Sequence, residues 1–446
     1  MTDSNRPTLT AMCERVLLSV LRRNWLTARV GRFRKLVRAV YEETGSINRA
    51  VSFAARFLYR KVPALLRRGL HPAKRPAAIR AEIHDARVAD NNAPLMAVRI
   101  SGVIGDHIVI ARFMRDLAAS AEEIRFDVYS GIPDHARWLF ASVKGFRNAL
   151  SDARFDSVAG EYDVSLTLNQ AAILHEEHAR WAILRRHSKL AGVCSNIVRY
   201  RPKIDTFVAN QPLLADALAR HALFANATRR DFLHRIADIP YGGDTLQVTT
   251  DAAATSRFGL AGKTYVTVHN GYDQNFTVSA GGLATKCYPH FGSVLAELKA
   301  TFPGLLTVQL GTSTSDPLTE ADLNLIDRTS IPEAAEVLRH SILHLDNEGG
   351  LVHLASCFNV PSCVVFGPTP SSYFGYPGNL NVDPNFCGGC WWVNLTWMDR
   401  CPRGFATARC MSEQDPHSVA RVVERYLKQK MLSSESERIG PAYAAD

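Results

Sequence analysis

Residues 342–370 contain the groups best suited to binding an anionic ligand. They predict a short apolar strand, a turn with Gly349 and Gly350, a helix start, and a second strand that ends in Gly367-Pro368-Thr369. The first turn of a helix leaves backbone N–H groups free and carries about half a positive charge. Paired glycines let the backbone approach a ligand closely, and His353 follows about one turn later. This pattern predicts a phosphate or pyrophosphate site at the carboxyl end of a parallel strand, with ordinary turn chemistry as the alternative.

A second group of residues has the chemistry of a metal site. Cys387, Cys390, Cys401 and Cys410 follow the spacing C-x2-C-x10-C-x8-C, so four of the nine cysteines lie close together in the sequence. Four thiolates favour a closed tetrahedral site with a structural role, which we expect to hold zinc, with iron as the second option and a chance cluster as the alternative. The preceding residues 374–386 are not basic, which argues against a zinc ribbon that binds nucleic acid.

The elements that must position these residues form two similar series. From residue 95 onward, short apolar strands alternate with helical stretches, which is typical of a parallel sheet covered by helices. Each series spans about 150–180 residues, so we predict an α/β protein with two Rossmann-like domains facing a cleft. The expected division is a helical extension and linker at 1–90, an N-terminal domain at 91–250, a C-terminal domain at 251–430 that includes the cysteine-rich segment 387–410, and a mobile tail at 431–446.

The positive charge is concentrated in the extension. Residues 1–90 carry 19 Lys and Arg against 7 Asp and Glu, which more than accounts for the formal net charge of +9 of the whole chain. Apolar positions at helical spacing predict a helix that either docks on the protein or brings residues 1–70 into peripheral contact with anionic lipid. We expect no nucleic-acid partner, because the rest of the chain is slightly acidic.

The composition indicates where in the cell the protein is expected. The chain is 46% hydrophobic and 21% charged, and it contains no run of 18 apolar residues that would predict a transmembrane helix. Its first residues lack the uninterrupted apolar core of a secretory signal, so we expect a cytoplasmic location and reduced thiols.

Three separated motifs resemble glycosyltransferase family 9, the lipopolysaccharide heptosyltransferase-like enzymes of the GT-B fold. The first motif, VRISGVIGDHIVIARFMRDL at 98–117, is similar to the opening strand, turn, Gly-Asp and helix of that family. The second, at 269–298, contains a lysine followed by an aromatic-proline pair, and the third is the segment 342–370. The resemblance covers residues 95–430 and implies two domains with a nucleotide-sugar site between them.

The resemblance implies roles for residues of the first two motifs. Asp106 matches the proposed catalytic base of the family, although aspartate is also among the best residues for capping a helix. Gly102 and Gly105 would give the substrates room at the same turn. Lys286 matches the lysine that contacts the donor phosphates, with Thr285 as a neighbour, and the alternative for Lys286 is a solvated surface lysine.

The third motif departs from the family pattern. Counted back from His353, the family's acidic position falls on Glu348, with Asp346 as the alternative carboxylate, and Gly349 stands where Ser or Thr is common. His353 would bond a phosphate or the sugar, or else serve as a capping or core histidine. Thr369 is a further hydroxyl that could line the ligand loop.

Together these residues imply an inverting glycosyltransferase that needs no catalytic divalent ion. Its donor would be a nucleotide sugar, with ADP-heptose implied by the resemblance, and its acceptor a glycan, a glycolipid such as lipid A–core, or a protein. The autotransporter heptosyltransferases of this broad family carry a four-cysteine iron site with different later spacings. The alternatives are a GT-B sugar-nucleotide epimerase and a non-catalytic protein that binds sugar nucleotides.

Overall fold

The computed structural model describes residues 75–89, 93–121, 123–272 and 284–438, together with Ile47 and Val51. The chain divides into two compact units, Met1–Ala73 and Lys74–Asp446. Apart from Ile47 and Val51, the first unit lies outside the described residues, and so does the helical extension expected there. No described helix is both long and apolar enough to cross a membrane.

The N-terminal half of the second unit contains a five-stranded sheet in the order β3-β2-β1-β4-β5, in which only β5 runs antiparallel to its neighbour. Its strands are β1 (Leu95–Ile100), β2 (Arg125–Ser130), β3 (Phe146–Ser151), β4 (Val164–Leu168) and β5 (Ala172–Leu174). Its helices are α4 (Pro76–Ala89), α5 (Ile104–Ala121), α6 (Pro133–Phe140), η1 (Asp152–Arg154), α7 (Phe155–Val158), η2 (Ala159–Glu161), η3 (Glu176–His178), α8 (Trp181–Leu184), α9 (Ser188–Tyr200), η4 (Arg201–Lys203), α10 (Asp205–Ala209), α11 (Ala215–Phe224) and α12 (Phe232–Ala237).

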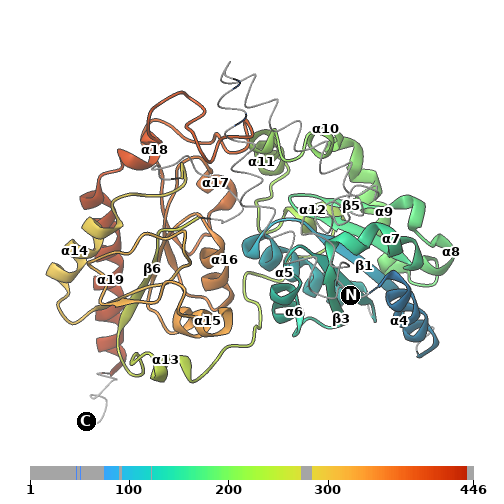
Figure 1. Ribbon diagram of the computed structural model, residues 1–446, viewed down its shortest axis with the longest axis horizontal. Helices are drawn as coiled ribbons and strands as arrows, with labels where there is room; N and C mark the ends of the chain where they lie inside the picture. The colour runs from blue at the N-terminus through green and yellow to red at the C-terminus, as the bar shows by residue number, and fades with distance from the viewer. Residues whose placement is uncertain are drawn as a thin grey trace, which may run out of the picture. The chain divides into compact units, whose positions relative to one another are not determined.

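The C-terminal half contains a six-stranded parallel sheet in the order β11-β10-β9-β6-β7-β8. Its strands are β6 (Tyr265–His269), β7 (Leu306–Gln309), β8 (Leu323–Asn324), β9 (His344–Asn347), β10 (Ser362–Val365) and β11 (Leu380–Val382). Its helices are α13 (Ala254–Arg257), α14 (Phe291–Thr301), α15 (Ile331–Arg339), α16 (Gly350–Cys357), α17 (Ser371–Phe374), α18 (Arg409–Ser412) and α19 (Pro416–Arg438). Helices α14 and α19 pack side by side on one face of this sheet (Figure 1).

Both sheets have the strand order of doubly wound α/β folds, in which the first strand of each half lies at the centre. Strands β1 and β9 are buried along nearly their whole length because helices cover both faces of a parallel sheet. The prediction of an α/β architecture with two Rossmann-like halves is therefore confirmed.

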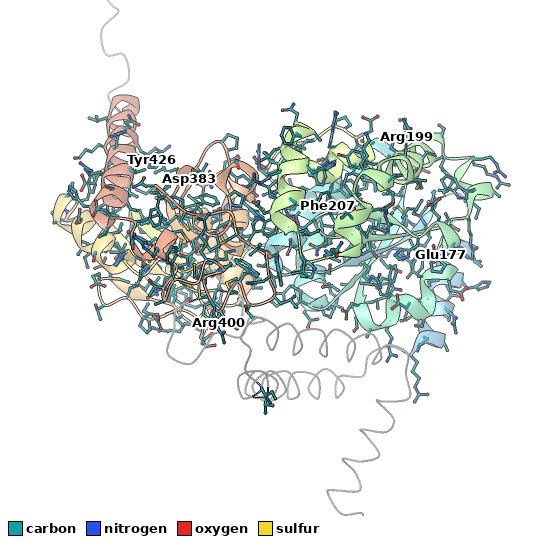
Figure 2. The ribbon with its side chains drawn as sticks, turned by 90° about the horizontal axis from the view of Figure 1, so that it is seen from above. Glu177, Arg199, Phe207, Asp383, Arg400 and Tyr426 are labelled. Atoms are coloured by element: carbon teal, nitrogen blue, oxygen red, sulfur yellow. The ribbon has the colours of Figure 1, made fainter. Side chains whose placement is uncertain are left out.

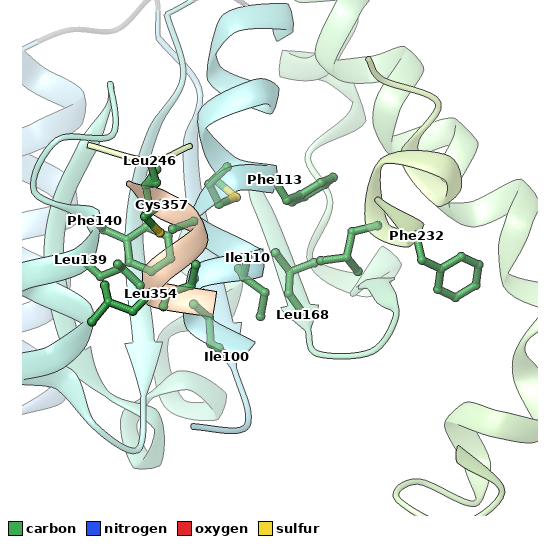
Figure 3. Packing of buried hydrophobic residues seen from close by; sticks show 14 of the residues in the cluster. Ile100, Ile110, Phe113, Leu139, Phe140, Leu168, Phe232, Leu246, Leu354 and Cys357 are labelled. Carbon is green, nitrogen blue, oxygen red and sulfur yellow. The ribbon is translucent and has the colours of Figure 1, made fainter. Parts of the chain in front are cut away.

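Helix α16 joins the hydrophobic cores of the two halves. Its side chains Leu354 and Cys357 are buried against Leu139, Phe140 and Leu246 of the N-terminal half and the connection that follows it (Figure 3). The helix that begins at the glycine pair is thus fixed by apolar packing against elements far away in the sequence.

The structure differs from the predicted elements at three places. Helix α4 begins at Pro76, inside the region 1–90 that we assigned to an extension and linker, and it buries Ile79 and Ile83 against the N-terminal sheet. Proline is well tolerated in the first turn of a helix, so it marks a start here and not a break. Strands β3, β5 and β11 were not predicted, and α19 continues to Arg438, past the point where we expected the mobile tail to begin.

Candidate functional site

Asp106 lies in the first turn of α5, directly after strand β1. Its Oδ2 accepts a hydrogen bond from the backbone N–H of Val103 at 3.2 Å, so the carboxylate does cap the helix start. Gly102 has a φ of +119°, and a Cβ at this position would overlap with the Asp106 side chain. The turn therefore requires glycine at 102, and it holds Asp106 at the carboxyl end of the central strand, where α/β proteins bind ligands.

The other carboxylate oxygen of Asp106 is paired with Arg229. Arg229 Nη2 donates to Asp106 Oδ1 at 2.8 Å, and the Arg229 side chain is only 1% exposed. The backbone N–H of Arg229 donates to Tyr373 O in α17, which ties this arginine to the C-terminal half. Sequence reasoning missed Arg229 because nothing in the pattern separates it from the other 51 Lys and Arg residues.

Lys286 and Glu348 form an ion pair next to the start of α16. Lys286 Nζ lies 2.5 Å from Glu348 Oε2, and both side chains are mostly buried. Glu348 comes just before Gly349, the residue that caps α16, so the lysine is held beside the free N–H groups of that helix start. The structure thus brings together Lys286, Glu348, Gly349 and Gly350 from the second and third motifs.

The starts of α5 and α16 are in direct contact (Figure 1). A Cβ on Gly105 would lie 2.7 Å from His353 Cδ2, and a Cβ on Gly350 would lie 2.5 Å from Ile104 Cγ2. Both positions therefore need glycine so that the two helices can approach. The space beside Gly105, where we expected room for substrate, is filled by His353.

His353 is a buried histidine at this junction. Its Nδ1 lies 2.6 Å from the Tyr376 hydroxyl, which also accepts a hydrogen bond from Arg112 Nη1 at 2.8 Å. Burial, followed by the positive charges of Arg112, Arg229 and Lys286, lowers the pKa of His353 well below its usual value. A neutral imidazole adds no positive charge to a phosphate site, which favours the core-histidine alternative.

Asp346 is fully buried below the start of α16. Its two oxygens bond His269 Nδ1 at 2.7 Å and His344 Nε2 at 3.2 Å. Burial alone would raise the pKa of this carboxyl, but the charge and hydrogen bond of His269 and the hydrogen bond of His344 outweigh it and lower the pKa. Both oxygens of Asp346 are thus used within the C-terminal half, whereas Glu348 is paired with Lys286 next to the start of α16.

The two predicted threonines are buried within the protein. Thr285 is 4% exposed, its Oγ1 donates to Trp397 O at 2.8 Å, and its N–H donates to Met398 O at 2.9 Å. Thr369 is 3% exposed. Thr285 therefore connects the loop that carries Lys286 to the cysteine-rich segment. The hydrogen of its hydroxyl is already used in a bond within the protein.

The cysteine-rich segment packs against the Gly367-Pro368 turn. Gly389 N and Trp391 N donate to the carbonyls of Gly367 and Pro368 at 3.3 and 3.1 Å. A Cβ on Gly367 would lie 3.3 Å from Cys410 Sγ. The segment thus contacts both the Lys286 loop and the Gly367-Pro368 turn.

The four thiols of this segment are all free. Burial first, and then the neighbouring Cys387, Cys390 and Cys401, raise the pKa of Cys410 to about 12. Burial, together with Cys401 and Cys387, likewise raises the pKa of Cys390 to about 11. In the described part of the chain the four sulfurs do not all lie within 4.8 Å of one another, so the closed tetrahedral arrangement is not formed.

No protein-family model matches the chain, and a search of curated proteins found no match. Among solved structures, TibC, the iron-containing dodecameric glycosyltransferase of enterotoxigenic E. coli H10407, aligns with 76% of this chain and 77% of its own at 15% identity and a TM-score of 0.52. TibC in complex with ADP-D-β-D-heptose aligns at 14% identity and a TM-score of 0.51. The E. coli ADP-heptose heptosyltransferase II aligns with 75% of this chain and 99% of its own at 15% identity and a TM-score of 0.47.

At these identities the likeness concerns the fold. The chain has the two-domain GT-B fold, and the structural similarity to heptosyltransferases that the three motifs predicted is confirmed at the level of the fold by TibC.

Proposed function

We propose that the chain is an inverting glycosyltransferase that moves a sugar from a nucleotide-sugar donor to an acceptor hydroxyl. The observation that carries this proposal is the junction of α5 and α16. There the turn that carries Asp106, a carboxylate able to accept a proton, meets the start of α16, which follows Glu348 of the Lys286–Glu348 pair and is suited to phosphate. Asp106 belongs to the N-terminal half and the Lys286–Glu348 pair to the C-terminal half, so each half would bind one of the two substrates.

The proposed reaction is a single displacement. Asp106 takes the proton of the acceptor hydroxyl as its oxygen attacks the anomeric carbon, and the bond to the diphosphate breaks with its electron pair on the phosphate oxygen. The anomeric centre is inverted. Arg229 and the Val103 N–H hold the Asp106 carboxylate from two directions, which fixes its orientation before the acceptor arrives.

On the donor side, Lys286 and the N–H groups of Gly349 and Gly350 would stabilise the charge that develops on the departing diphosphate. These groups supply positive charge from the protein, which supports a reaction that does not depend on a divalent ion. Glu348, next to the lysine, would accept hydrogen bonds from ribose or sugar hydroxyls. Gly102 and Gly105 shape the turn that carries the base.

We propose ADP-heptose as the donor, supported by the three motifs and by a solved TibC structure that contains this molecule. The acceptor would be a glycan, a glycolipid such as lipid A–core, or a protein, in the cytoplasm. The test is release of nucleoside diphosphate with and without acceptor. A transferase forms a glycosylated acceptor, an epimerase converts the donor alone, and a non-catalytic binder does neither, so either of the last two results refutes the proposal.

We also propose that Cys387, Cys390, Cys401 and Cys410 bind one zinc or iron ion in a structural site, supported by the spacing of these free thiols in the sequence and by the effect of the other three on the pKa of Cys410. Since this segment supports the Lys286 loop and the Gly367-Pro368 turn, Cys390→Ser should lower the thermal stability and weaken donor binding. Metal analysis, melting curves and nucleotide titration measure these effects. Cys363→Ser, a buried cysteine outside the segment, is the control for bound metal; equal metal content in both variants would contradict the proposed site.

For residues 1–70 we propose peripheral contact with the anionic surface of the inner membrane, on the basis of their excess of basic residues. Removing residues 1–73, at the boundary between the two compact units, should reduce cosedimentation with anionic liposomes at low salt. Equal cosedimentation of the full chain and the shortened chain would contradict the proposed membrane contact of residues 1–70.

A further inference from the structure

A cluster of metal-ligating side chains lies in the N-terminal half, away from the site described above. Strand β5 runs antiparallel to β4, and the N–H of His175 donates to Ser165 O at 2.9 Å. Helix η3 therefore lies near the amino ends of the parallel strands, whereas Asp106 follows a carboxyl end. Glu177 is seen at the periphery of this half in Figure 2.

We propose that His175, Glu177 and His178 bind one divalent transition-metal ion, with zinc as the best match. One ligand atom from each of these residues lies within 4.8 Å of the other two. His175 Nδ1 is 3.4 Å from Glu177 Oε1, and the two imidazole rings are nearly parallel with centroids 5.9 Å apart. Two imidazoles and one carboxylate form a borderline donor set that suits zinc and leaves a position for water.

The surroundings of His175 resemble the outer shell of a metal ligand. Its Nε2 lies 2.8 Å from Thr167 Oγ1, which also accepts a hydrogen bond from Arg99 Nε at 3.1 Å. When Nε2–H donates to this hydroxyl, the lone pair of Nδ1 points toward the Glu177 carboxylate, and a cation fits between them. Metal-ligating histidines are usually fixed by such a hydrogen bond on the second ring nitrogen.

His178 supplies an independent observation. Its Nδ1 is buried and has no hydrogen-bond partner among the described residues. A buried polar nitrogen without a partner is uncommon in proteins and costs free energy, which a bound ion would recover. The same ring faces Gly160, where a Cβ would lie 3.5 Å from His178 Cδ2, so its Nδ1 edge is the one turned away from that glycine.

The charge of Arg99 does not exclude a cation here. Arg99 Nη1 lies 2.8 Å from Asp156 Oδ1, and its guanidinium stacks on the Phe155 ring at 4.5 Å. With Arg99 neutralised by Asp156, the metal would face two neutral imidazoles and the Glu177 carboxylate, which is 65% exposed. The ion would hold His175, Glu177 and His178 in one arrangement and so stabilise η3, while His175 is bonded to Thr167 of β4 through its other ring nitrogen.

The test is zinc titration by calorimetry, with untagged, metal-free protein carrying Cys387→Ser and Cys390→Ser so that only the histidine site remains. We expect one bound zinc per chain, no binding in His178→Gln, and binding weakened at least about tenfold in Glu177→Gln. Zinc should raise the melting temperature of the parent protein but not that of His178→Gln. His417→Gln, an exposed histidine of the C-terminal half, is the matched control.

If the double cysteine variant does not fold, the same comparison is made by metal analysis of the zinc-loaded full chain with its cysteines intact. His178→Gln should then contain one zinc fewer than the parent and than His417→Gln. Equal zinc content in all three proteins, or a parent titration with no zinc bound, overturns the proposal. None of these readouts depends on sugar transfer, so they stand apart from the proposed function.

Discussion

Replacing Asp106 with asparagine should slow sugar transfer by about 10²–10⁴-fold, the range that a general base contributes, while binding of the nucleotide sugar is retained. Asparagine keeps the shape of the side chain and one oxygen that can accept from Arg229, but it cannot take the acceptor proton. The rate constant of transfer and the donor affinity of the variant, measured separately, check this expectation.

Asp134→Asn is the matched control for this variant, since Asp134 is an exposed aspartate of the same half, paired with Arg137. It should leave both measurements unchanged. Melting curves are needed as well, because the asparagine leaves the buried Arg229 without its carboxylate partner. A folded Asp106→Asn protein with near-normal transfer would show that another group accepts the proton.

Replacing Lys286 with alanine should lower kcat/KM by about 10²–10³-fold or more, comparable to the loss of one preorganised charge donor at a transition state. The variant also leaves Glu348 mostly buried, with its closest cationic partner removed, beside the place of the diphosphate. We therefore expect weaker binding of nucleoside diphosphate, measured by calorimetry, together with a lower rate.

A second substitution separates the two effects of Lys286. In Lys286→Ala/Glu348→Gln the negative charge is gone, so nucleotide affinity should partly recover while the rate stays low. Full recovery of the rate would mean that the lysine only neutralises Glu348. Lys299→Ala removes a comparable pair with the more exposed Asp322 and should change neither quantity.

The local parts of the candidate site could be predicted from the sequence. The strand, glycine pair and helix expected within residues 342–370 are β9, Gly349-Gly350 and α16, because turns and helix starts are determined by residues close together in the chain. The turn at Gly102 and Asp106 has the same local origin. The resemblance then supplied the expectation that these distant turns belong to one site.

The partners of these residues could not be predicted, because they depend on tertiary packing. Arg229 reaches Asp106 across 123 positions of sequence, and His353 loses its charge through burial against the opposite half. Thr285 and Asp346 carry groups that suit a ligand, but the folded chain uses those groups for its own hydrogen bonds. A single sequence shows which side chains can do chemistry, not which ones the fold leaves free.

The central claim is that Asp106 and the start of α16 form one transferase site, and a mass-spectrometric screen of nucleotide sugars, with acceptor extracts, tests it most directly. We predict that the wild-type chain releases nucleoside diphosphate from one nucleotide sugar, which we expect to be ADP-heptose. Asp106→Asn should bind the same nucleotide sugar without releasing nucleoside diphosphate from it. Binding of no nucleotide sugar by the wild-type chain, or equal release by the two proteins, would contradict the account.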